Sequence, residues 1–509
     1  MIIPVGEFLP DQRDFQNPGS SLVQNVVPRT MESYGPFGGL SAQFSALNAR
    51  CQGARGFRDS TGNAHAFAGT ATKLYHATTS AGWTDVSSKT YTISEDDYWS
   101  FEQFGDVIYA SNFADGLFKF NMLSDSVFSG AALTGTAPKP KYLAVSKDFM
   151  LTAYTDDLSG GTKNQRVWWP AINDPTNWPA AGGNSAIAVL SDYQDVVGDW
   201  GDCTGIVANV GPCDAAVFFQ RGVFRMMYAG QPDIWDFFQV HGARGCVSPQ
   251  SLRATEIGVI YLGNDDFYLF DGQGCTGIGY QKIAKWFYSQ IDQTNLEHVV
   301  AAVDPINKFY IVAWPSSLAT PGTCDSMLIC AYMQPSLTGT PGRWSYITGI
   351  SVEYLFRSMS FGYTMDNMNS LGNLDSIGIS LDSRVWSGNQ EVLTAFDTTH
   401  TMNYFTGPNL APTVETSETQ PTEGNRTLIT NAWPLVDGGT PSLQWGVRNR
   451  LIDSAVFNTA VPIMANGMAP QFAEGRYHRC RITLPANSSF NHIQGVEVPD
   501  ESLANTGRA

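Results

Sequence analysis

Residues 215–274 have the sequence AAVFFQRGVFRMMYAGQPDIWDFFQVHGARGCVSPQSLRATEIGVIYLGNDDFYLFDGQG, and this stretch decides the fold. Ala216–Phe219 and Val223–Tyr228 are short apolar runs. Arg221-Gly222 separates them and predicts a hairpin, because glycine adopts positive φ at no steric cost. Each run is too short for a helix and rich in the residues that favour strands.

The second half of this stretch repeats the pattern of strand, turn and strand. Val259–Leu262 and Phe267–Phe270 flank Asn264-Asp265-Asp266. These three residues resemble a calcium-binding loop only in composition, so we expect a solvated hairpin turn there.

The composition of the whole chain agrees with a protein built from short strands. Of its 509 residues 12% are aromatic and only 15% are charged, and it contains 49 Gly and 27 Pro. A helical protein usually carries more Glu, Lys, Leu and Ala. The chain is long enough for two or more cores. We therefore predict an all-β protein, in which Lys282–Ile291 is the best helical pattern.

Similar strand pairs recur along the chain at nearly regular intervals. Their turns are centred near Gly105, Lys147, Gly211, Gly258 and Asn307. The intervals are 42, 64, 47 and 49 residues, and a four-stranded propeller blade takes roughly 40–50. The longest interval holds an insertion around Asn173–Trp178. We predict a β-propeller of about five to seven blades with loop insertions in residues 41–397, and stacked sandwiches remain the alternative.

Two further regions flank the predicted propeller. Residues 1–40 are polar and rich in proline, which blocks helix, so we expect an extended N-terminal arm that packs on the propeller. Residues 398–509 contain Tyr477–Leu484, where polar and apolar residues alternate as in a strand with one buried face. We predict a C-terminal antiparallel β-sandwich, or platform domain, whose tail from Asp500 onward is frayed.

Charge and cysteine content exclude several classes of protein. The formal net charge is −17, whereas a nucleic-acid binder is usually basic. The eight cysteines form no CxxC pair, so we expect reduced thiols packed as small hydrophobic side chains. The N-terminus lacks the features of a signal peptide, and no window has the roughly 18 apolar residues of a membrane helix. We expect folding in a cytosol and no membrane segment.

No motif in the sequence predicts catalysis. There is no P-loop, GxSxG, HExxH or EF-hand loop, and no SxDxGxxW box of the propeller glycosidases. Glu95-Asp96-Asp97 could supply acid and base groups, but adjacent strand residues point to opposite faces, so we expect a solvated turn. No histidine lies within four residues of another. We predict no catalytic residues, no cofactor and no metal.

Five arginines give the C-terminal region a local basic bias. They are Arg448, Arg450, Arg476, Arg479 and Arg481. One interpretation is a subunit contact with an acidic neighbour, and the other is ordinary arginines on strand surfaces. The sequence leaves both open.

Several phrases of the sequence resemble one family. Leu9-Pro10-Asp11, Asp14–Gly19 and Asn25–Pro28 resemble the start of tail proteins of short-tailed phages and prophages. Phe218–Gly272 is similar to part of the phage tail-hub or nozzle proteins, also called packaged-DNA stabilisation proteins. Gly475–Val498 looks like the ending of a family of phage structural proteins. These phrases cover most of the chain thinly, and none is an active-site motif.

The resemblance implies a structural protein of the virion tail, assembled in the host cytoplasm. Six copies would form a ring around the DNA channel below the portal and the tail adaptor or head-completion protein. The ring would retain the genome, guide its ejection and carry a tail fibre or spike. An acidic lumen would let duplex DNA slide without specific binding. The alternatives are a receptor-binding or glycan-cleaving tail protein, and a cellular propeller scaffold that binds peptides.

Overall fold

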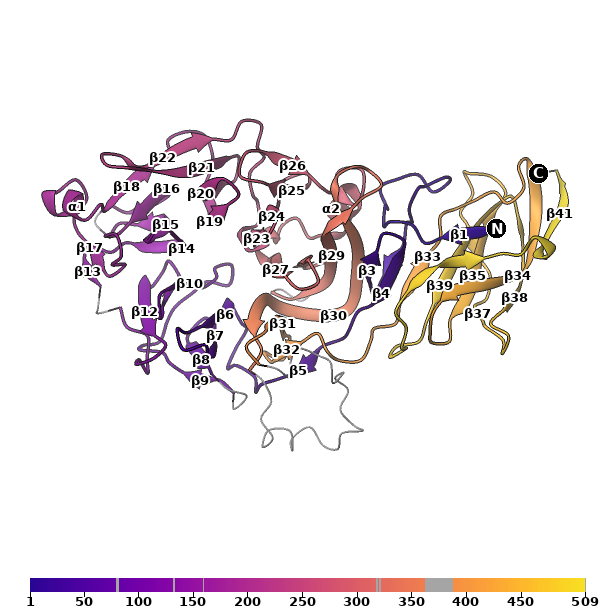
Figure 1. Cartoon of the computed structure of the whole chain (residues 1–509), viewed down its shortest axis with the longest axis horizontal. Coiled ribbons are helices and arrows are strands. Elements are labelled where there is room, and N and C mark those ends of the chain that lie inside the picture. The colour runs from indigo at the N-terminus through magenta and orange to yellow at the C-terminus, as the bar shows by residue number, and fades with distance from the viewer. Residues whose placement is uncertain are drawn as a thin grey trace.

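The chain is all-β, as predicted. A computed structural model describes residues 1–78, 82–130, 133–158, 160–316, 319, 322–361 and 388–508. Strands make up 51% of the structure and helices 4% (Figure 1). Among the described residues the α-helices are α1 (Asn184–Ala188) and α2 (Ala284–Gln290), and α2 lies inside the predicted helical segment 282–291. No described helix is long and apolar enough to cross a membrane.

Five small antiparallel sheets follow one another along the first half of the chain. The first sheet contains β6 (Ala54–Arg58), β7 (Ala64–Gly69), β8 (Leu74–Ala77) and β9 (Thr84–Asp85). The second contains β10 (Ser100–Phe104), β11 (Val107–Ser111) and β12 (Leu117–Asn121). The third contains β14 (Lys139–Ser146), β15 (Phe149–Asp156), β16 (Thr162–Trp169) and β18 (Asp192–Asp195).

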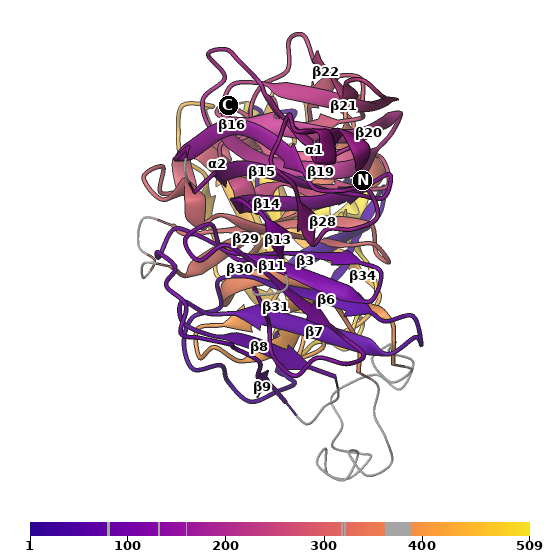
Figure 2. The same ribbon diagram turned by 90° about the vertical axis from the view of Figure 1, so that its left-hand side faces the viewer.

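The fourth and fifth sheets have the same order of strands. The fourth contains β19 (Cys203–Val210), β20 (Cys213–Phe219), β21 (Val223–Gly230) and β22 (Ile234–Gln239). The fifth contains β23 (Arg253–Thr255), β24 (Gly258–Leu262), β25 (Phe267–Phe270) and β26 (Cys275–Gly277). In Figure 2 the third and fourth sheets lie at the top and the first at the bottom.

A sixth sheet begins with four antiparallel strands and then continues further. Its strands are β27 (Val300–Asp304), β28 (Phe309–Trp314), β29 (Cys324–Pro335) and β30 (Pro341–Met359). The long strand β30 pairs with β29 along its first part and with β31 (Glu391–Asp397) along its second. The strands β32 (Met402–Tyr404) and β5 (Ser41–Ala42) extend this second part.

The strand pairs predicted from the sequence are confirmed. Each predicted centre lies at the hairpin between the first two strands of a sheet, from the second sheet to the sixth. At one of them Lys147 and Asp148 have φ of 49° and 64°, which makes a two-residue type I′ turn. The insertion predicted around Asn173–Trp178 lies between β16 and β18 and contains β17 (Asn177–Trp178), and α1 follows it before β18.

One predicted turn is only partly solvated. Asp265 is exposed between β24 and β25, but Asp266 is buried. The carboxylate of Asp266 accepts the backbone N–H of Phe267 at 2.7 Å and of Tyr280 at 3.1 Å, and burial raises its pKa to about 7. The expectation of a solvated turn is therefore wrong for Asp266, because this carboxylate organises the chain ahead of α2.

Hydrophobic clusters join each sheet to the next. A separate cluster lies between sheets one and two, two and three, three and four, and four and five. The cluster that joins sheets five and six extends into the C-terminal region, and one more contains residues of sheets six and one. Pairs that illustrate these clusters in order are Phe67 and Phe120, Leu117 and Leu143, Phe149 and Trp235, Phe218 and Phe270, Phe267 and Trp344, and Ile311 and Tyr75. Each of these sheets therefore shares a cluster with the next, and the sixth shares one with the first.

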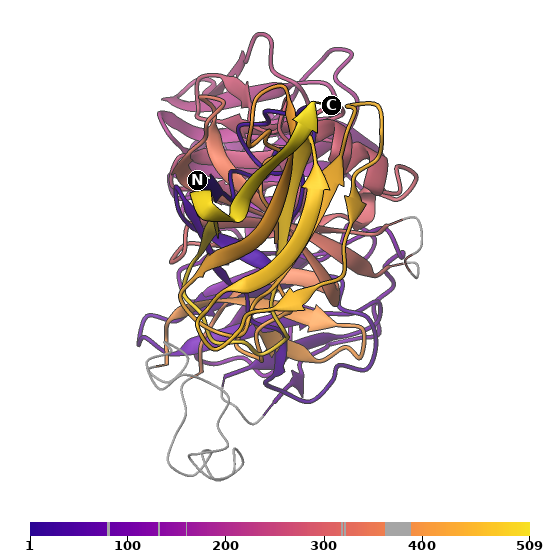
Figure 3. The same cartoon turned by 90° about the vertical axis from the view of Figure 1, so that its right-hand side faces the viewer.

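The C-terminal region adds two more groups of strands (Figures 1 and 3). One group, which continues the sixth sheet, contains β33 (Thr413–Glu415), β35 (Ser442–Arg448), β36 (Val456–Phe457), β37 (Val461–Pro462) and β39 (Tyr477–Thr483). The other contains β34 (Asn425–Val436), β38 (Ala469–Gly475), β40 (Ile493–Glu497) and β41 (Leu503–Arg508). Both groups contribute to one hydrophobic cluster, which includes Trp445 and Ile429. The predicted frayed tail is wrong, because β41 pairs along β34.

The N-terminal segment, residues 1–40, pairs with both the sixth sheet and the C-terminal region. Strand β1 (Ile2–Pro4) pairs with β40, and β3 (Val26–Thr30) pairs with β4 (Ser33–Pro36), which also pairs with β40. Strand β2 (Val23–Gln24) lies between β30 and β33, so one sheet runs from the sixth sheet into the C-terminal region. The prediction that this arm packs on residues 41–397 is incomplete, because most of its strand pairing is with the C-terminal region.

Two carboxylates of the same segment anchor it to α2. Asp11 accepts the backbone N–H groups of Lys285 and Trp286, both at 2.8 Å, at the first turn of the helix. Glu7 and Lys282 are both fully buried, with 3.8 Å between Oε1 and Nζ. The ammonium also donates to the carbonyl of Gly342 at 3.0 Å, and burial lowers its pKa.

All eight cysteines are free thiols. Seven are buried and Cys275 is partly buried. Burial raises the pKa of several, for example that of Cys246 to about 12. The prediction of reduced thiols packed as small hydrophobic groups is confirmed.

The Glu7–Lys282 pair gives a test of the N-terminal anchor. Replacing Glu7 by Ala leaves a buried ammonium without its carboxylate, so we expect the free energy of unfolding to fall by about 3–5 kcal/mol. The control is Asp14→Ala, because Asp14 is half exposed and lies 3.7 Å from Arg448, and we expect a loss below about 1 kcal/mol. Urea denaturation measures both, and equal losses would contradict the account.

Candidate functional site

The first strands of the six sheets surround a cavity of about 820 Å³. Residues of β6, β10, β14, β19, β23 and β27 line it, together with the second part of β30. The segments that precede β10, β23 and β27 form part of the rim. The cavity is thus the point at which all six sheets meet.

Charged side chains of both signs line this cavity in equal numbers. They are Arg55, Lys141, Arg253 and Arg357, and Asp96, Asp97, Glu102 and Glu297. The chain as a whole has a net charge of −17, so the acidic character of the molecule is not concentrated here. The cavity is polar but close to neutral.

Half of these charges form ion pairs between neighbouring sheets. Arg55 of β6 binds Glu102 of β10 at 2.5 Å, and Lys141 of β14 binds Asp97 ahead of β10 at 2.6 Å. Arg253 of β23 donates Nε to the carbonyl of Ala301 in β27 at 2.7 Å. These contacts hold adjacent sheets together.

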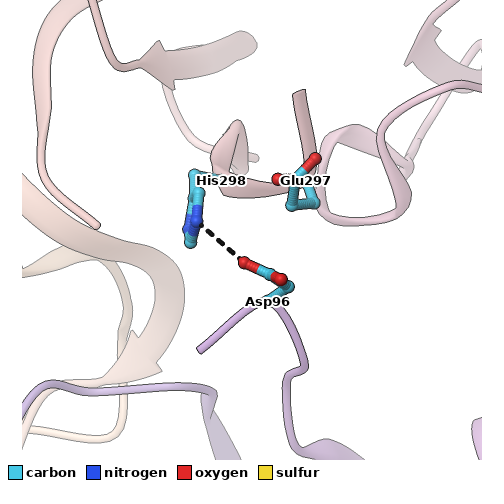
Figure 4. A group of neighbouring side chains, drawn as sticks. All are labelled: Asp96, Glu297 and His298. Atoms are coloured by element: carbon cyan, nitrogen blue, oxygen red, sulfur yellow. Dashed lines mark ion pairs between the residues drawn. The ribbon is translucent and has the colours of Figure 1, made fainter. Parts of the chain in front are cut away.

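Asp96, Glu297 and His298 form a cluster at the rim (Figure 4). Asp96 comes from the turn ahead of β10, and the other two come from the short helix η2 (Leu296–His298) ahead of β27. One ligand atom of each lies within 4.8 Å of the others, and Nε2 of His298 lies 3.2 Å from Oδ1 of Asp96. The sequence prediction placed Asp96 in a turn, which is confirmed, but nothing in the sequence relates it to His298, about 200 positions away.

A fourth residue, Arg50, decides what this cluster can bind. Its Nη2 lies 3.1 Å from Nδ1 of His298. Guanidinium only donates, so Nδ1 accepts and Nε2 carries the proton, which it donates to Asp96. A metal on Nε2 would require the opposite tautomer, with a proton on Nδ1 facing Arg50. The three side chains as arranged do not fit a divalent cation. We call Arg50, Asp96, Glu297 and His298 the rim cluster.

The environment of His298 favours its neutral form. The side chain is buried, and both this burial and the charge of Arg50 lower its pKa. Glu297 and Asp96 act in the opposite direction. The side chain of Asp96 is 66% exposed, so water weakens its effect.

Four of the five predicted arginines pair with acidic residues of the same chain. Arg448 is partly buried and binds the buried Glu418 at 2.5 Å. Arg450 is exposed and binds Asp453 at 2.8 Å, three positions along the chain.

The other three arginines lie on or beside β39. Arg481 binds Glu415 at 2.6 Å, and Arg479 lies 3.6 Å from the same carboxylate. Arg476 stacks over the ring of Tyr477. None of the five arginines is among the described residues that line the cavity. Their role as a subunit contact stays a prediction, and the pairs within the chain are those expected of arginines on strand surfaces.

Comparison with known proteins gives no family. No family model matches the chain, and no curated protein matches it. Among solved structures, the computationally designed Ika8 protein aligns with a TM-score of 0.38 at 8% identity, over 79% of this chain and 99% of that chain. The Mitotic Checkpoint Complex aligns with a TM-score of 0.36 at 9% identity, over 74% of this chain and 95% of that chain. Neither likeness is close enough to support an argument.

The tautomer of His298 gives a test of the rim cluster. In the variant Arg50→Met, Nδ1 is free to carry the proton, so Nε2 becomes available as a ligand. We expect Zn²⁺ to bind this variant in calorimetric titration and not the unmodified protein. The double variant Arg50→Met, His298→Ala is the control and should not bind. Binding of Zn²⁺ to the unmodified protein through His298 would show that the tautomer of His298 does not prevent metal binding.

Proposed function

We propose that the chain is a structural subunit of the virion tail, a nozzle or hub protein of a short-tailed phage, and that it is not an enzyme. The six sheets would form a closed six-bladed β-propeller, and the two C-terminal groups of strands would form a β-sandwich. Six copies would surround the DNA channel below the portal and adaptor, retain the genome and guide its ejection.

One observation supports a scaffold more than any other. The hydrophobic clusters run from each sheet to the next and from the sixth back to the first, so the sheets stabilise one another around a cycle. At the junction of the first and sixth sheets, Arg58 of β6 donates to the carbonyl of Asn389. Such an arrangement covers the faces of the sheets, leaves only short sheet edges and makes a stiff unit.

The cavity itself is not the proposed DNA channel. A volume of about 820 Å³ suits one small molecule and is too small for a length of duplex DNA. The proposed channel lies instead between copies of the chain. With a charge of −17 per copy, its walls would repel phosphate, so that DNA could slide.

The closed cycle can be tested at a close approach between backbones. A Cβ added at Gly56 in β6 would lie 2.6 Å from the Cα of Ser358 in β30, so we expect Gly56→Ala to lower the free energy of unfolding by roughly 1–3 kcal/mol. A Cβ added at Gly274 would meet nothing within 4 Å, which makes Gly274→Ala the matched control. Equal effects of the two substitutions on urea denaturation would argue against a closed cycle.

The nozzle proposal is tested by the mass of the native assembly. We expect a six-fold ring in native mass spectrometry, or a monomer that forms one only when a tail adaptor protein is added. A ring contact joins two different faces of the subunit, as rotational symmetry requires. A stable trimer that cleaves polysaccharide would instead support the receptor-binding or glycan-cleaving alternative.

A further inference from the structure

We propose that His298 is an acid-sensitive switch at the junction between the first and sixth sheets. When His298 is neutral, Arg50 holds this junction closed. When His298 is protonated, the junction loosens. The inference rests on the rim cluster of a single chain, so it is independent of the proposed ring and of its place in a virion.

The neutral form holds the junction closed through one guanidinium. Arg50 precedes β6, the first strand of the first sheet, and His298 precedes β27, the first strand of the sixth. Arg50 donates Nη2 to His298 at 3.1 Å and to the hydroxyl of Tyr98 at 3.0 Å, and Nη1 to the carbonyl of Glu95 at 2.9 Å. One side chain thus joins the starts of the first and sixth sheets to the turn ahead of the second.

Protonation reverses the preference of His298 for its neighbours. A second proton on the ring must lie on Nδ1, where it would face the N–H of Arg50 and place two cations 3.1 Å apart. On its other side the imidazolium would be attracted to Asp96 and Glu297. His298 would therefore be held by the carboxylates while Arg50 is displaced, and the contact between the first and sixth sheets would be lost.

Among the residues that the structure describes, Cys324, Glu353 and His400 also lie near this junction. The thiol of Cys324 donates to the backbone carbonyl of His298 at 3.2 Å. Behind Arg50, the N–H of Cys51 donates to Glu353 at 3.3 Å, and this carboxylate binds His400 at 2.8 Å. His400 is thus a second titratable group at the same junction, with a carboxylate and not a guanidinium as its partner.

The sign of the pH dependence follows from the environment of His298. Its pKa is lowered in the folded protein from an ordinary value of about 6.5, so the unfolded or opened state binds the proton more readily. The contribution of His298 to the junction is complete above about pH 6.5 and is lost as the pH falls through the folded value.

Hydrogen–deuterium exchange at pH 7.5 and pH 5, corrected for intrinsic exchange, tests the switch. For residues 47–58 we expect exchange at pH 5 to be about tenfold faster, because the open junction binds the proton more readily than the closed one. In His298→Asn an amide oxygen can accept from Arg50 at both pH values, so the acid response should disappear. His400→Asn is the matched control and should keep it.

Three outcomes would overturn the proposal. The first is that exchange in the unmodified protein does not become faster at pH 5. The second is that the His298→Asn variant keeps the full acid response. The third is that Zn²⁺ protects residues 94–98 and 296–303 from exchange at pH 7.5, which would make the cluster a metal site. If His298→Asn does not fold, Arg50→Met serves instead. This variant should exchange fast at both pH values, and an acid response retained in it would equally contradict the switch.

Discussion

The structure depends on the sharing of apolar faces between neighbouring sheets. Each of the six sheets is too small to bury its own surface, and each contributes to a cluster on either side. The inner strands show the result, because every residue of β7, β24, β27 and β28 is buried. The cluster between the sixth and first sheets is decisive, since without it the first sheet would expose one apolar face.

This constraint explains what could be predicted from the sequence. Strands covered on both faces have continuous apolar sequences such as Phe309–Trp314, and tight turns such as Lys147-Asp148 separate them, so both signals are local. The pairing of β2 with β30 and β33 joins residues more than 300 positions apart, and β41 returns to β34 across about 75. Such pairings depend on partners that no local pattern identifies. The packing of residues 1–40 was therefore only partly predicted, and the prediction of a frayed C-terminal tail was wrong.

The same limit applies to the candidate site. The carboxylates at 95–97 were assigned to a turn correctly, but His298 meets Asp96 and Arg50 only because the starts of three sheets converge at the rim. Half of the charges of the cavity are used in this convergence, as Arg55 with Glu102 and Lys141 with Asp97 illustrate. Ion pairs inside the cavity thus hold the sheets together, while the excess of acidic residues lies elsewhere in the chain.

The central claim, that the first and sixth sheets close a cycle, is tested most directly by native-state hydrogen exchange in increasing urea. If the cycle is closed, β6–β9 and β27–β31 belong to one cooperative unit and lose protection at the same urea concentration. Loss of protection in β6–β9 at clearly lower urea, while β27–β31 stay protected, would contradict the account.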